Sequence, residues 1–251
     1  MKPRRSASGL ALVCALMLML AAMVIGLAVV RGGFILLAAA RNERDRDVAW
    51  AAAEAALRDA EHDIAGTADP PPERAAHFGP AGASAFVDGC GRGEDDLGLC
   101  RARSPPAWET LDLADAGNPA LVPYGRFTSA VLAVGRGGLT ARLPAYVIER
   151  IAPAGAVAQQ GSFYRVTAIG FGMRTSTRVV LQSLVRLPPP ASGAGGDHGH
   201  GNDDDEGHDN GNEDARGGGN GDRPPERRLP AGRIGWREIA NWDELHARTR
   251  P

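Results

Sequence analysis

Two cysteines are of a residue type and at a spacing that suit a chemical role. Cys90 and Cys100 close the short segment GCGRGEDDLGLC. Such a pair either forms a disulfide or supplies two thiolates to a metal ion. No histidine lies near them in sequence, which makes a poor metal site. The choice between the two therefore depends on whether this part of the chain is exported.

A second candidate is an acidic block near the C-terminus. Residues 197–214 hold eight carboxylates and three histidines, with no lysine or arginine. Carboxylates suit Ca²⁺ and imidazoles suit Zn²⁺ or Ni²⁺. However, the spacing matches neither an EF-hand nor a regular glycine-rich calcium repeat. Because the net charge is −2 and the block contributes −8, the remainder carries about +6. Low apolar content favours a disordered linker over residues 191–228 rather than a metal site, and we expect no metal and no cofactor.

Catalytic and nucleic-acid motifs are missing from the sequence. There is no phosphate-binding loop, no HExxH and no G-x-S-x-G. The histidines outside the acidic block, His62, His77 and His246, are far apart in sequence. The arginines are spread along the chain without interleaved aromatic residues. We therefore predict that the protein is not an enzyme and does not bind nucleic acid.

The element that decides the compartment is an apolar run at the N-terminus. Leu10 to Val30 holds 21 uncharged residues, which corresponds to about 32 Å of helix. That length matches a hydrocarbon core of about 30 Å. Lys2, Arg4 and Arg5 precede the run, so the N-terminus is predicted to be cytoplasmic and the remainder exported. Export places the cysteine pair in an oxidising compartment and favours the disulfide over the metal site.

Two other readings of the apolar run are less favoured. A cleaved secretory signal has an apolar core of about 7–15 residues followed by a small-residue cleavage site, and this run is longer. Lipoprotein processing at Cys14 requires a small residue directly before the cysteine, and Val13 stands there. Cys14 is then interpreted as a small apolar residue of the helix.

The helix is predicted to continue beyond the membrane to residue 65. No proline occurs from Phe34 to Ala65, and alanine is abundant. One face carries an apolar seam that fits a globular domain better than a coiled-coil stalk, because it lasts only about two heptads. Its members are Trp50, Ala53, Leu57, Ala60 and Ile64. On another face Glu54 and Arg58 can pair. Gly32 and Gly33 are a soft point, and Gly66 with the following prolines ends the helix.

The exported part is predicted to be an α+β domain. Residues 67–126 look irregular, with one short helix or strand. Four later runs have strand character: FTSAVLAVG, LPAYVIERI, SFYRVTAIGFG and TSTRVVLQSLVRL. The last two should form an antiparallel hairpin, and the alternation in the third predicts a half-buried strand. The fold class is thus pilin-like α+β, with one long helix packed on a small antiparallel sheet.

The C-terminal segment GRIGWREIANWDEL regains amphipathic character after the acidic linker. Trp236 and Trp242 are unsuited to free solvent, so the segment either docks on its own domain or forms a partner-binding tail. The predicted organisation has six parts, with boundaries at 1–9 (leader), 10–30 (membrane-spanning half of the helix), 31–65 (amphipathic half), 66–190 (head), 191–228 (linker) and 229–251 (C-terminal segment).

The basic start, Ser8-Gly9 and the abrupt apolar helix resemble a type IV prepilin leader. This resemblance implies that a prepilin peptidase cuts between Gly9 and Leu10 and that Leu10 becomes N-methylated. Most pilins carry a glutamate at the fifth mature position, which is thought to meet a neighbour's free amine. Here that position is Cys14. The departure favours a subunit at a cap or initiating position over the bulk building block.

Further segments resemble the PilX family of type IV pilus minor pilins. They are VVRGG, NERDRDVAWAAAEAALRDAE, the pair Cys90 and Cys100, YRVTAIGFGMRTSTRVVLQSLV and GRIGWREI around Trp236. The resemblance implies a single-pass inner-membrane protein that joins a pilus at or near its tip. Its implied partners are membrane lipid, other minor pilins and the major pilin through the helix, and a PilY-type tip adhesin. The alternatives are a type II secretion tip pseudopilin and a singly anchored envelope protein outside any filament.

Overall fold

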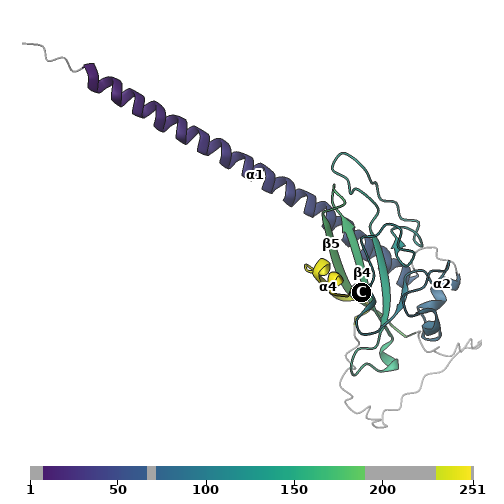
Figure 1. The fold of residues 1–251 in the computed structure, drawn as a ribbon. Coiled ribbons are helices and arrows are strands. Elements are labelled where there is room, and N and C mark those ends of the chain that lie inside the picture. Colours follow the sequence, from purple (N-terminus) through teal and green to yellow (C-terminus); the bar gives the residue numbers. More distant parts are fainter. Residues whose placement is uncertain (1–7, 67–71, 190–229, 250–251) are drawn as a thin grey trace, which may run out of the picture.

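The computed structural model describes residues 8–66, 72–189 and 230–249. Helix α1, Ser8–Ala65, is 58 residues long, and its N-terminal half projects away from a head that holds every other element (Figure 1). The predicted end is confirmed, because the chain leaves the helix at Gly66 with a φ of 63°. The helix is continuous through Gly32 and Gly33, where the sequence indicates a soft point.

The head is built on a six-stranded sheet in the order β1-β3-β4-β5-β6, with β2 also paired to β3. Antiparallel pairing joins β3 to β4, β4 to β5 and β5 to β6, whereas β1 runs parallel to β3. The sheet is therefore mixed, and the prediction of a purely antiparallel sheet is wrong at β1. The strands are β1 Leu99–Arg101, β2 Val122–Pro123, β3 Ala145–Ile151, β4 Ser162–Phe171, β5 Arg178–Leu187 and β6 Gly232–Glu238.

Short helices precede, separate and follow the strands. The bounds are α2 Pro72–His77, η1 Pro80–Ala85, α3 Ala107–Thr110, η2 Ala158–Gln160 and α4 Trp242–Thr249. Of these, α2 and η1 lie between α1 and β1, α3 and η2 lie between strands, and α4 follows β6. The region before residue 126, expected to be irregular with one short element, thus holds several. Each is brief because glycine and proline recur through it.

One face of the sheet packs on the second half of α1. The predicted seam is confirmed, since Ala53, Leu57 and Ala60 are fully buried against Tyr164, Val166 and other residues of β3, β4 and β5. The backbones of β4 and α1 come very close at Gly170. A side chain at Gly170 would place its Cβ 2.2 Å from the backbone of Ala49 and Ala53. Glycine is therefore needed where β4 crosses under α1.

The other face of the sheet is also covered, which corrects the prediction of a half-buried strand. Ile169 and Phe171 of β4 lie in a second apolar cluster with Trp108, Val180 and Trp242. The cover comes from α3, the loop after it and α4. These segments are distant from β4 in sequence, so the alternation within β4 could not reveal them.

The run FTSAVLAVG is not a strand. Its Phe127 is buried, whereas Val131 is 92% exposed. Ser129 has a φ of 57°, which breaks an extended backbone. The run turns because the Gly125 amide and the Thr128 hydroxyl both donate hydrogen bonds to Asp59 of α1. The predicted hairpin of β4 and β5 is confirmed, with Phe171 opposite Arg178 at its closed end.

Candidate functional site

The largest exposed apolar surface of the described chain is the projecting half of α1. Leu10, Met23 and Leu36 are each more than 70% exposed, and similar residues occur all around the helix. This half is long and apolar enough to cross a membrane, and none of it is buried by the head. A helix that is apolar all round requires lipid or other helices as its surroundings.

The predicted processing residues lie in the first turns of this helix. Gly9 and Leu10 belong to α1, whose first described residue is Ser8. Leu10 is 75% exposed, and Cys14 is an exposed free thiol. The fold leaves this end of α1 free of contact with the head (Figure 1). Cleavage after Gly9 and methylation of Leu10 stay predictions.

The two cysteines of the head are joined in a disulfide, as predicted from their short loop and the expected export of this part of the chain. Cys90 and Cys100 have Cα atoms 4.1 Å apart and are both buried. Cys100 belongs to β1, so the bond ties the loop before β1 to the edge of the sheet. Because both sulfurs are used in this bond, the cysteines do not form a metal site. No cluster of three or more metal-ligating side chains occurs among the described residues.

Carboxylates on the buried side of α1 hold the loops of the head. Asp45 is 1% exposed and accepts hydrogen bonds from the Thr177 hydroxyl at 2.6 Å and from Arg174 Nε at 2.9 Å. It also accepts one from the Met173 amide. Burial raises the pKa of Asp45, but these hydrogen bonds outweigh it and the pKa lies below its ordinary value. Asp45 thereby fixes the β4–β5 turn to the helix.

Asp63 joins α1 to the other end of the head through Arg74. Asp63 and Arg74 are both fully buried and form a two-pronged ion pair, with nitrogen–oxygen distances of 2.6 and 3.1 Å. Arg74 also donates to the carbonyls of Asp95 and Leu97 and lies over the Phe127 ring at 3.7 Å. The guanidinium therefore joins α2, two loops and α1.

The surroundings of Asp63 also contain Tyr146 and Asp59. The Tyr146 hydroxyl donates to Asp63 at 3.2 Å, and burial together with the charge of Asp63 raises the pKa of Tyr146 well above its ordinary value. Asp59 accepts from Gly125 and Thr128. Burial raises the pKa of Asp59, and these hydrogen bonds offset the increase only in part.

These anchoring residues were missed from the sequence, although a signal for them exists. Asp45, Asp59 and Asp63 fall on the same helical stripe as the buried alanines, such as Ala49 and Ala56. An acidic residue within an apolar seam must find a partner, because a buried unpaired charge is very costly. Which segment of the head supplies the partner, such as Arg74 of α2, cannot be predicted from spacing.

The C-terminal strand β6 lies along the flank of α1. Arg46 pairs with Glu238 at 2.5 Å, and Arg233 pairs with Glu54 at 2.9 Å and with Glu61 at 2.6 Å. Between these ion pairs, Trp50 and Trp236 pack edge to face with ring centres 5.7 Å apart. Trp236 nevertheless stays 56% exposed. The predicted pairing of Glu54 with Arg58 is also present, at 3.3 Å.

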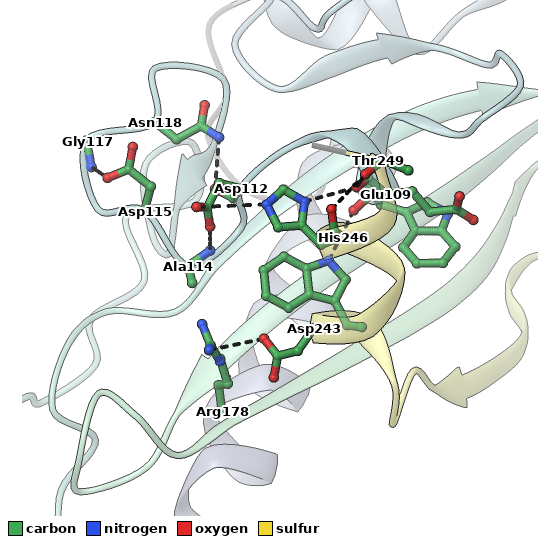
Figure 2. A network of polar contacts seen from close by, with 12 residues as sticks. Glu109, Asp112, Ala114, Asp115, Gly117, Asn118, Arg178, Asp243, His246 and Thr249 are labelled. Atoms are coloured by element: carbon green, nitrogen blue, oxygen red, sulfur yellow. Dashed lines mark hydrogen bonds and ion pairs between the residues drawn. The ribbon is translucent and has the colours of Figure 1, made fainter. Parts of the chain in front are cut away.

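Helix α4 docks on the opposite face of the sheet (Figure 2). Trp242 is 3% exposed, and its Nε1 donates to the Trp108 carbonyl at 3.1 Å. The Trp242 ring stacks on His246, whose Nδ1 lies 3.0 Å from the Glu109 carbonyl and so carries the hydrogen. The C-terminal segment therefore docks on its own domain. Of its two tryptophans, only Trp236 presents a surface to a partner.

A polar cavity of about 430 Å³ lies beside α4. Its lining includes Asp112, Asp115, Arg178, Asp243 and His246. Arg178 and Asp243 pair at 3.1 Å, and the His246 Nε2 lies 3.9 Å from Asp112. The other two scattered histidines lie on different elements, His62 on α1 and His77 on α2. The cavity is lined by groups that hold α4 in place.

Comparison with known protein families agrees with this architecture. The family described as "PilX N-terminal" matches residues 8–58, and "Type IV pilus assembly protein PilX C-term" matches residues 38–187, more than half of the chain. The matched residues end with β5, so the Trp236 segment, expected to be part of the resemblance, lies beyond them. No curated protein and no solved structure matches the chain. PilX proteins serve pilus structure and assembly rather than catalysis, and the exposed apolar helix fits membrane anchoring and association with other pilins. This chain belongs to the PilX family of type IV pilus assembly proteins.

Proposed function

We propose that this minor pilin acts at or near the tip of the pilus as an initiating subunit. In this proposal the chain enters the inner membrane with its N-terminus in the cytoplasm and its head exported. The prepilin peptidase cuts after Gly9, and Leu10 is methylated. The basic residues before α1 support this orientation, since cytoplasmic flanks carry an excess of Lys and Arg.

The observation that supports the tip position is the lack of any carboxylate on the projecting apolar part of α1, Leu10 to Ala40. The first acidic residue of the chain is Glu43, just before the helix meets the head. Cys14 stands where most pilins have the glutamate that pairs with a neighbour's terminal amine. The helix can therefore pack among other helices, but it cannot make that pairing to the next subunit.

The partners follow from the surfaces that the head leaves open. The apolar half of α1 would contact membrane lipid first, and then other minor pilins and the major pilin. On the head, exposed Trp236 at the flank of α1 offers an aromatic anchor for a further partner, such as a PilY-type adhesin. Trp242 is unsuited to this role because it is buried beneath its own domain.

Two alternatives are separable from this proposal. A type II secretion tip pseudopilin usually carries a large helical domain in its head, whereas no helix of the described head exceeds the eight residues of α4. This favours the type IV pilus. An envelope protein outside any filament would have the same membrane helix but would keep its N-terminus uncut.

Mass spectrometry of the mature N-terminus tests the proposal. We expect the chain isolated from membranes to begin at methylated Leu10, and the Gly9→Val variant to keep Met1. Sheared pili should contain the processed chain in a few copies near one end, seen by immunogold labelling. An N-terminus at Met1 in the wild type, or labelling along the whole length of the pilus, would contradict it.

A further inference from the structure

The exposed apolar surface of α1 is longer than a membrane is thick. It runs from Leu10 to Ala40, broken by a single charge at Arg31. These 31 residues span about 46 Å of helix, whereas a hydrocarbon core is about 30 Å thick. Roughly a third of this surface therefore stays outside the hydrocarbon at any depth of insertion.

Arg31 has no partner in the described part of the chain. Its side chain is exposed, and none of the residues 8–66, 72–189 and 230–249 forms a hydrogen bond or ion pair with it. No aspartate or glutamate occurs before Glu43, which lies twelve residues along the helix, about 18 Å away. The helix thus presents one unneutralised positive charge within an apolar surface, nearer its C-terminal end.

A lipid bilayer alone cannot cover the apolar residues on both sides of Arg31 along the helix and also leave Arg31 outside the hydrocarbon. If the membrane covers Leu10 to Val30, the ring formed by Phe34, Ile35, Leu36 and Leu37, each 56–72% exposed, is left in water. If the helix sinks until this ring is covered, Arg31 enters the hydrocarbon, where a charge is expensive. A bundle of helices covers both sides, but it encloses Arg31 and so must neutralise it.

We propose that Arg31 is the docking point for a partner helix that carries one carboxylate within an otherwise apolar run. This rests on the proposed role as a filament subunit and names the chemistry of its neighbour. A guanidinium and a carboxylate form two parallel hydrogen bonds, which fix the axial register of the two helices. A second copy of this chain does not fit, because its own apolar run holds no carboxylate.

The pairing is testable with the full-length chain and defined helices. The chain is labelled with a fluorophore at Cys14, the one cysteine outside the disulfide, and reconstituted in phosphatidylcholine vesicles at pH 8. Synthetic Leu/Ala helices with a single central Glu, Gln or Lys carry the acceptor. We expect the Glu helix to associate about tenfold more tightly than the Gln helix.

Variants at two arginines decide the outcome. Arg31→Gln should remove the preference for Glu, and Arg31→Glu should transfer it to the Lys helix. Arg41→Gln, which changes an arginine at the upper border of the apolar surface, should retain the preference for Glu. Equal binding of the Glu and Gln helices to the wild type, or an unchanged preference in Arg31→Gln, would overturn the proposal.

Arg31 could instead contact lipid headgroups or a second copy of this chain. Each of these partners gives a different result, and each result counts against the proposal. If Arg31→Gln changes only the depth of the helix in the vesicles, Arg31 serves lipid headgroups. If the chain self-associates through Arg31 and Glu43→Gln abolishes this, the partner is a second copy. Since the vesicles contain no pilus, either result leaves the proposed function to the separate test of the mature N-terminus.

Discussion

Single buried charges decide how firmly the head is joined to its helix. Asp63 and Arg74 are both inaccessible to solvent and satisfy each other together with two carbonyls and a tyrosine. Arg74→Ala removes one member and leaves Asp63 buried without its positive partner. We expect a loss of about 3–5 kcal/mol in the free energy of unfolding.

The loss at Arg74 can be measured by tryptophan fluorescence during chemical denaturation of the full chain in detergent, since all four tryptophans lie in the head. Arg58→Ala is the matched control. Arg58 is 68% exposed and pairs with Glu54 only at 3.3 Å, so its removal should cost about 0.3–0.5 kcal/mol. Comparable losses for the two variants would show that burial does not strengthen the Arg74 pair.

Asp45 and Asp59 predict opposite dependences on pH. The pKa of Asp45 is lowered in the folded protein, so its contribution is full above the unfolded value of 3.8 and is lost as pH falls through the folded pKa. The pKa of Asp59 is raised, so its contribution decreases as pH rises from 3.8 through the folded value. Compared with the wild type, unfolding midpoints should therefore vary less steeply with pH below 3.8 in Asp45→Asn, and should rise more steeply with pH above 3.8 in Asp59→Asn. Slopes equal to those of the wild type in both windows would contradict the prediction.

Elements that are long and periodic could be predicted from the sequence. The end of α1, its buried seam and the β4–β5 hairpin follow from spacing within one stretch of chain. β1, β2 and β6 could not be foreseen, because each gains its hydrogen bonds from a strand distant in sequence. The run around Val131 has the composition of a strand, but it forms a turn because Gly125 and Thr128 donate hydrogen bonds to Asp59 of α1. For the candidate site, the cysteine pair and the apolar helix could be recognised in the sequence. The role of Arg74, and the burial of Trp242 but not of Trp236, became apparent only from the fold.

The two elements of the C-terminal segment should respond differently to the loss of their tryptophans. Trp242 of α4 is buried and hydrogen-bonded to Trp108, so Trp242→Ala should destabilise the head by about 3–5 kcal/mol. Trp236 of β6 is 56% exposed, so Trp236→Ala should cost less than about 1.5 kcal/mol.

Denaturation curves and the pilus count per cell together distinguish a structural tryptophan from a partner-binding one. Trp236→Ala should leave the chain folded yet reduce piliation, as expected for an interface anchor. Normal piliation in a stable Trp236→Ala variant would remove that role. A stability loss as large as that of Trp242→Ala would instead make Trp236 part of the core.

The two halves of α1 have different surroundings in the whole molecule. The half within the head is fixed by buried carboxylates, by the sheet and by β6, whereas the projecting half makes no contact with the head and is free for a bundle (Figure 1). The buried contacts join the head firmly to its half of the helix. We therefore expect the place of this subunit in a filament to depend in part on the two polar side chains within the projecting apolar surface, Cys14 and Arg31.

The Cys14→Glu variant tests this dependence on the assembled pilus. It restores a carboxylate at the fifth mature position, so the helix can pair with a neighbour's terminal amine and should enter positions along the filament. We expect the ratio of this chain to major pilin in sheared pili, measured by quantitative mass spectrometry, to rise several-fold. Cys14→Ser, which is also polar but uncharged, should leave the ratio unchanged. An unchanged ratio in Cys14→Glu would mean that the head, rather than the missing carboxylate, restricts this subunit to few positions.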